Sequence, residues 1–137
     1  MTGLCDLEIS TSGMTGDIQG DGTEALVTSV TARYYSRKQR HYLLFEIDGD
    51  KCHIEFDDTG LLYKRQGQLT YEMVMRTGQA SCIEMKTAYG KMHTDYSVDM
   101  YRADIADDRM EIGIDYRAAD NECHMKITVG ERKVPRH

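Results

Sequence analysis

The sequence of 137 residues contains no tryptophan, only two phenylalanines and a single proline, Pro135. Proline cannot donate a ladder hydrogen bond, so its absence from the body of the chain leaves every segment free to pair as a strand. Phosphate-binding loops, GxGxxG runs and serine elbows are also missing. The sequence therefore carries no recognisable catalytic motif, and we expect a protein that is not an enzyme.

Positive charge is scarce as well. The chain has 17 Lys and Arg against 23 Asp and Glu, a formal net charge of −6. An acidic surface repels phosphate backbones and anionic lipids, so we expect neither nucleic acid nor a membrane as a partner. The first ten residues lack the basic and apolar regions of a secretory signal, and no apolar run approaches the ~20 residues of a membrane span. We therefore expect a cytoplasmic protein.

Cysteine occurs four times without a CxxC pair, as Cys5, Cys52, Cys82 and Cys123. In a reducing compartment we expect free thiols that are mostly buried. The pairs Cys52-His53 and Cys123-His124 resemble metal ligands. Adjacent strand residues point to opposite faces, however, so neither pair can chelate one ion. We predict a buried cysteine beside an exposed histidine, no metal site and no cofactor.

The stretch GDIQGDGTE, residues 16–24, has the ligand spacing with which a calcium loop begins. An EF-hand loop starting at Asp17 needs a bidentate Glu at its twelfth position, which is Thr28 here. Strand patterns flank the stretch, where helices would be required. We therefore predict a glycine-rich connection between the first two strands.

Apolar and polar residues alternate with period two through most of the chain, most clearly over 69–76, 92–101, 110–117 and 123–129. Turn sequences such as Asp48-Gly49-Asp50 and Gln66-Gly67-Gln68 separate about ten such runs. Closure of a meander removes its edges, and the even spacing favours it over a sandwich. We predict an all-β protein in which residues 1–137 form one antiparallel, up-and-down, closed barrel of about 8–10 strands.

Methionine and tyrosine dominate the predicted interior. Methionine is flexible and polarisable, and a barrel of this size is either filled by side chains or holds one small ligand. Parity also places Met100 on the inner face. The candidate ligand-binding residues are Arg65, Tyr71, Met73, Met75, Met85, Met92, Tyr96, Met110, Tyr116 and Met125.

Arg65 shares the parity of Leu61 and Tyr63, and an inward cation needs a partner. It could bind a ligand carboxylate, or it could pair with an internal Glu such as Glu84 or Glu46. Other acidic groups have simpler interpretations. We expect His93, Asp95 and Asp99 on a solvated strand face, and Asp57-Asp58 and Asp107-Asp108 in turns.

Several motifs occur in an order typical of one known family. They are Arg65-Gln66-Gly67, Ile83-Glu84-Met85 and Thr87-Ala88-Tyr89-Gly90, preceded by Gln19 with Asp21-Gly22 and a hairpin from Tyr34-Tyr35 to Tyr42. In this order they resemble the YwiB-like family of small bacterial proteins. The resemblance implies a calycin-like, that is lipocalin-like, barrel, and the family has no established activity to carry over. Ala88 stands where family members often have proline.

Two functions remain open at this point. The first is a binding module with a small apolar or amphiphilic ligand in a Met- and Tyr-lined interior. The second is a structural or interaction barrel with a filled core, either a monomer or a homodimer.

Overall fold

The computed structural model describes residues 3–12 and 26–131, and all regular structure in these residues is β-strand. Residues 16–24, predicted as a connection, lie outside the described part. The described residues form no helix able to cross a membrane. The strands are β1 (Gly3–Ser12), β2 (Leu26–Arg37), β3 (Arg40–Ile47), β4 (Asp50–Phe56), β5 (Leu61–Gln66), β6 (Tyr71–Met75), β7 (Ala80–Thr87), β8 (Gly90–Ile105), β9 (Arg109–Ala118) and β10 (Asn121–Glu131).

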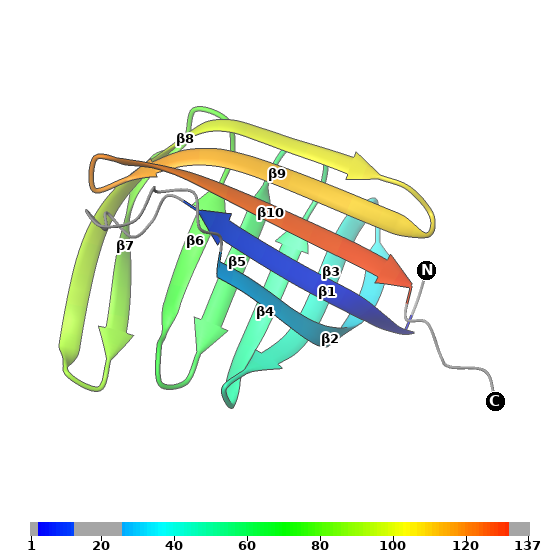
Figure 1. The fold of residues 1–137 in the computed structure, drawn as a ribbon, viewed down its shortest axis with the longest axis horizontal. Coiled ribbons are helices and arrows are strands. Elements are labelled where there is room, and N and C mark those ends of the chain that lie inside the picture. Colours follow the sequence, from blue (N-terminus) through cyan, green and yellow to red (C-terminus); the bar gives the residue numbers. More distant parts are fainter. Residues whose placement is uncertain (1–2, 13–25, 132–137) are drawn as a thin grey trace.

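The ten strands form one sheet in the order β6-β5-β4-β3-β2-β1-β10-β9-β8-β7, and every paired neighbour is antiparallel. Figure 1 shows the sheet folded on itself, with β8, β9, β10 and β1 running across the front and β3 to β7 behind them at a steep angle. Two layers crossed in this way bury their facing sides between them. The predicted all-β antiparallel barrel is confirmed.

Two long strands turn the corners between the layers. In β2, residues 26–34 pair with β1 while residues 33–37 pair with β3. In β8 the register shifts between Val98 and Met100, so Asp99 is an extra residue that bends the strand. The shift reverses the parity: Val98 and Tyr101 are buried, whereas Met100 is 45% exposed. The predicted inward position of Met100 is therefore wrong, because period two does not continue through a bulge.

The barrel is nearly closed between its edge strands β6 and β7. One backbone bridge joins Thr70 to Lys86. Farther along the seam, the Tyr96 hydroxyl donates to the Val74 carbonyl (2.8 Å) and accepts from the Val74 amide (3.1 Å). A side chain of β8 thus replaces part of the missing ladder and holds the two edges together.

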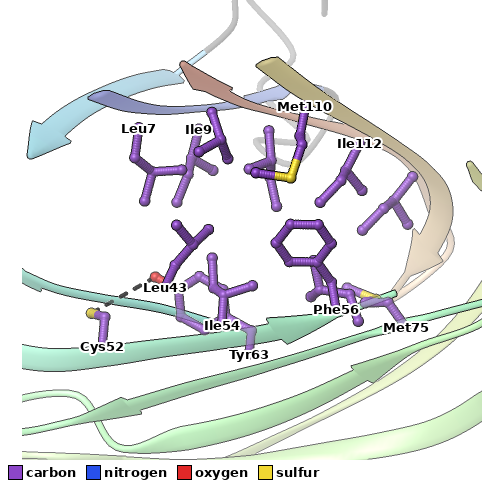
Figure 2. Packing of buried hydrophobic residues seen from close by; sticks show 14 of the residues in the cluster. Leu7, Ile9, Leu43, Cys52, Ile54, Phe56, Tyr63, Met75, Met110 and Ile112 are labelled. Carbon is purple, nitrogen blue, oxygen red and sulfur yellow. Dashed lines mark hydrogen bonds between the residues drawn. The ribbon is translucent and has the colours of Figure 1, made fainter. Parts of the chain in front are cut away.

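Aliphatic and aromatic side chains fill the middle of the barrel. Figure 2 shows Leu7, Ile9, Met110 and Ile112 of the front layer pointing toward Leu43, Ile54 and Phe56 of the back layer. Phe56, Leu43, Ile54 and Ile112 are each 0% exposed. Complete burial of such a side chain contributes about 1.5–3 kcal/mol, so this packing is the main source of stability.

Candidate functional site

The barrel has two ends with different turns. The Asp48 end has the turns at 48–49, 67–70, 88–89 and 119–120, and the Asp57 end has the turns at 38–39, 57–60, 76–79 and 106–108. At the Asp57 end the large inward side chains of Phe56, Leu61 and Met75 are 0%, 2% and 1% exposed, while Ala103 is half-buried and Ile105 is 37% exposed beside the turn. The Asp48 end differs in degree, because more of its inward apolar side chains pack on the core but remain half-buried. They are Ile47, Tyr71, Met73, Ala118 and Met125.

Nine of the ten predicted site residues fall into two groups, one in the packed core and one at the Asp48 end of the barrel. Met75, Tyr96, Met110 and Tyr116 are buried, at 1%, 5%, 1% and 2% exposure, and belong to the packed core. The half-buried residues gather at the Asp48 end, on β5, β6, β7 and β10. They are Arg65, Tyr71, Met73, Met85 and Met125.

Met92 does not lie in the interior. It has the inward parity of Tyr96, but it sits beside the β7–β8 turn, where it pairs with Met85 and is 59% exposed. The hairpin runs past the region that the opposite layer covers (Figure 1). The alternation of residues along a strand shows on which face a side chain lies, but not whether the opposite layer reaches that side chain. The predicted interior position of Met92 is wrong for this reason.

Arg65 has an internal carboxylate partner, and it is Asp50. Arg65 Nε lies 2.8 Å from Asp50 Oδ2, and the Arg65 side chain is 13% exposed. The predicted partners Glu84 and Glu46 are wrong, since Glu84 instead pairs with Lys91 and Glu46 is exposed. An arginine has five N–H donors, so the bond at Nε leaves donors for a further acceptor.

Asp50 is the one buried charged residue among those that the structure describes, at 2% exposure. Besides Arg65, it accepts hydrogen bonds from the Gln68 amide (2.7 Å) and the Leu69 amide (3.1 Å). These backbone hydrogen bonds, together with Arg65, hold the pKa of the Asp50 carboxyl below its usual value, although burial opposes them. Asp50 therefore stays ionised and fixes the β5–β6 turn against the start of β4.

Sequence reasoning treated Asp50 only as part of a turn. The signal that could have found it is its parity, because Asp50 alternates in step with the inward Cys52, Ile54 and Phe56. A carboxylate on an inward face needs a cation, and Arg65 was the inward cation available. Parity indicates that both side chains point inward, but their proximity depends on the pairing of β4 with β5.

Two tyrosine hydroxyls and a thiol lie beside the ion pair of Asp50 and Arg65. The rings of Tyr63 and Tyr71 stack with centroids 5.8 Å apart, and the Tyr63 hydroxyl lies 3.9 Å from Cys52 Sγ (Figure 2). Burial raises the pKa of both phenols, and of the Cys52 thiol, above their usual values. At neutral pH these groups are therefore neutral hydrogen-bonding groups rather than nucleophiles.

The remaining candidates, apart from His53, lie where the simpler interpretation put them; His53 was predicted to be exposed but is half-buried on β4. Cys52 and Cys123 are buried at 3% and 1%, while His124 is exposed and bonds Asp115. His93, Asp95 and Asp99 are exposed on β8. Asp57 caps its own turn by accepting hydrogen bonds from Thr59 and Gly60. Within residues 3–12 and 26–131, no group of three or more His, Cys, Asp or Glu could hold a metal ion.

Comparisons with known proteins agree with this architecture. The solved structure of the ywiB protein from Bacillus subtilis superposes with a TM-score of 0.80 at 20% sequence identity, over 96% of this chain and 93% of that chain. This likeness shows a shared fold. None of the curated proteins matches the sequence. The family model of a domain of unknown function, DUF1934, matches residues 9–128. The chain therefore belongs to the DUF1934 family, and its predicted resemblance to the YwiB-like proteins is confirmed.

Proposed function

We propose that this protein is a non-enzymatic binding barrel that holds one small amphiphilic molecule at the Asp48 end. The observation that carries the proposal is the uneven burial of the interior. Apolar side chains are buried in the middle and, apart from Ala103 and Ile105, at the Asp57 end, whereas Tyr71, Met73 and Met125 are half-buried at the Asp48 end. Half-exposed methionines form an adaptable apolar surface that a ligand would cover.

The filled middle of the barrel limits the ligand. Leu43, Ile54 and Ile112 occupy the space in which a deep pocket would lie. The ligand therefore lies shallowly, with an apolar part against Met73 and Met125. A polar part would reach the Arg65 guanidinium and the Tyr71 hydroxyl, which are neighbours. Because Asp50 already neutralises Arg65, a neutral or singly anionic head group fits this end better than a polyanion.

Native mass spectrometry of the freshly purified chain tests for a co-purified ligand, and thermal shifts with fatty acids of increasing chain length test binding directly. We expect Met73→Gln to weaken binding of the best fatty acid by about tenfold, because the amide replaces an apolar contact worth about 1.5 kcal/mol. Met100→Gln is the matched control, since Met100 lies on the outer face and should leave affinity unchanged. A ligand-free mass with no thermal shift, or equal effects of the two variants, would contradict the proposal.

Arg65 needs a separate test because it also has a structural role. Arg65→Met should lower both the stability and the affinity for fatty acids, whereas the corresponding fatty alcohols should be affected less. If stability falls while the fatty acid and the alcohol retain their original affinities, Arg65 serves only the Asp50 ion pair.

A further inference from the structure

Apolar and aromatic side chains are exposed on the outer face of the strands β1 to β4, where a solvated strand face should be polar. Leu4 is 52%, Tyr35 42% and Leu44 38% exposed. Arg33 pairs with both Leu4 and Leu44, His53 pairs with Leu44, and Tyr35 pairs with Tyr42, so these residues form one patch across β1 to β4. We call this patch the Leu44 face; it consists of Leu4, Arg33, Tyr35, Tyr42, Leu44 and His53.

Three rings of the Leu44 face stack in a row across β2, β3 and β4. The Tyr35 and Tyr42 ring centroids are 4.7 Å apart with planes 7° from parallel, and the Tyr42 and His53 centroids are 6.2 Å apart. His53 Nε2 is shielded from solvent and has no hydrogen-bond partner. It lies 3.3 Å from Glu55 Oε1, but without hydrogen-bond geometry. Part of this face is thus already dehydrated, which is typical of a surface that packs against another surface.

The charges of the Leu44 face also differ from those of the other layer. Beyond Leu4, the outer faces of β1, β8, β9 and β10 are mostly polar, and their carboxylates outnumber their lysines and arginines. The Leu44 face lies among charges of both signs: its Arg33 lines one shallow hollow with Lys51 and Glu46, next to Leu4 and Leu44. Copies that each carry a net charge of −6 repel one another through their acidic layers and least through this mixed face.

We propose that the Leu44 face is the interface of a homodimer, in which two copies pack face to face about a two-fold axis that passes near Leu44. A two-fold contact brings the same patch of both copies together, so the patch has to complement itself. An apolar centre with charges of both signs around it meets this condition. A strongly acidic or strongly basic partner would meet like charge at Glu46 or at Arg33. The proposal does not depend on a ligand in the barrel.

Sedimentation equilibrium of the full chain, over roughly 1 to 300 µM, measures the association. We expect wild type to approach twice the chain mass of 15.7 kDa. Leu44→Glu should shift the dimer–monomer midpoint to at least about tenfold higher concentration, because it buries a carboxylate at the axis. Ile105→Glu is the matched control at 37% exposure on β8 and should leave the midpoint unchanged. Both variants should keep the wild-type circular dichroism spectrum, since both sites are exposed.

Disulfide trapping locates the axis without an added charge. In a Cys82→Ser background, which removes the exposed native thiol, Leu44→Cys should form a covalent dimer on mild oxidation, whereas Ile105→Cys should not. If wild type were monomeric at every concentration in the sedimentation experiment, the Leu44 face would bind a different partner or none, and the proposal would be overturned. A dimer that survives Leu44→Glu, or that cross-links through Ile105→Cys but not through Leu44→Cys, would place the interface elsewhere and overturn it equally.

Discussion

The hydroxyl of Tyr96 bonds both backbone groups of Val74, donating to the carbonyl at 2.8 Å and accepting from the amide at 3.1 Å. The two residues are 22 positions apart and belong to strands that share no ladder. Val74 lies on an edge strand, so these backbone groups would otherwise lack a partner on the β7 side. One phenol thus satisfies a donor and an acceptor that the incomplete ladder leaves open.

Tyr96→Phe should therefore destabilise the protein by about 1–3 kcal/mol, because it leaves an amide and a carbonyl of Val74 without their partner. Urea unfolding measures the change, and hydrogen exchange at the Val74 amide should accelerate more than exchange at buried strand positions. Tyr89→Phe is the control, since Tyr89 is fully exposed at the β7–β8 turn and should leave the unfolding midpoint within error. Equal midpoints for wild type and Tyr96→Phe would show that the seam does not need the hydroxyl.

Removing the Asp50 charge should change how stability responds to acid. The folded state holds the pKa of Asp50 below the ordinary 3.8, so this group's contribution is complete above about pH 3.8 and is lost as the pH falls through the lower folded pKa. Asp50→Asn should lower stability at pH 7, because an amide cannot accept at both positions and places a donor against Arg65 or a backbone N–H.

The same variant should flatten the loss of stability between about pH 4 and pH 2, measured by urea unfolding at each pH. Asp48→Asn is the control, because Asp48 is exposed in the turn between β3 and β4 that precedes Asp50. If the unfolding free energy of Asp50→Asn fell between about pH 4 and pH 2 as steeply as that of wild type, the loss of stability could not be assigned to Asp50.

A side chain at Gly67 should be poorly tolerated. A Cβ at this position would overlap the Asp50 carboxylate, and Gly67 has a φ of +156°, which side chains rarely adopt. Gly67→Ala should therefore lower the thermal midpoint clearly, by displacing the carboxylate that organises the turn. Gly113→Ala provides the comparison, because a Cβ there meets nothing within 4 Å. Similar thermal midpoints for the two alanine variants would show that the Gly67 turn can move away from the Asp50 carboxylate at little cost in stability.

Stability should also fall as the pH drops below neutrality, through His41. Burial against Phe56, with ring centroids 5.0 Å apart, lowers the pKa of His41 below 6.5, although Asp57 opposes the shift. Below pH 6.5 the unfolded chain binds the proton first, so stability is complete above 6.5 and declines as the pH falls toward the folded pKa. The slope of unfolding free energy between pH 7 and pH 5 should be smaller in His41→Gln than in wild type. An unchanged slope would assign the effect to other groups.

The four thiols should react very unevenly. Cys5, Cys52 and Cys123 are buried, in agreement with the prediction of mostly buried thiols, and Cys82 is exposed. Titration of the native protein with a disulfide reagent should modify one thiol per chain, and all four should react in denaturant. Cys82→Ser should abolish the native reaction. Two or more fast thiols in the native protein would show that the barrel opens on the timescale of the assay.

Strand positions were predictable because period-two alternation is a local property. It correctly placed Met75, Tyr96, Met110 and Tyr116 inside. The failures arose where the fold departs from a regular ladder. The extra residue Asp99 turned Met100 outward. The β7–β8 hairpin extends beyond the opposite layer of the sheet, so Met92 is exposed.

The candidate site was less predictable, since it depends on which strands meet. The sequence indicated that Arg65 needed a carboxylate, but the choice of Asp50 follows from the β4–β5 pairing and the close approach of the Gly67 turn. The seam held by Tyr96 involves strands without a common ladder, and no local pattern specifies such a contact. Uneven burial at the two barrel ends is likewise a property of the assembled layers.

The pairing of β1 with β10 has a topological consequence. Cys5 lies opposite Glu131, so the first and last described strands are neighbours, while the sheet's two edges meet at the 76–79 turn. A circular permutant that joins the present termini by a short linker and opens the chain at Gly78 would read β7, β8, β9, β10, β1 and on to β6. Every ladder would then join strands that are neighbours along the chain, and only the seam contacts, such as the Thr70–Lys86 bridge, would be long-range. We expect such a permutant to fold faster than the natural order, because its contact order is lower.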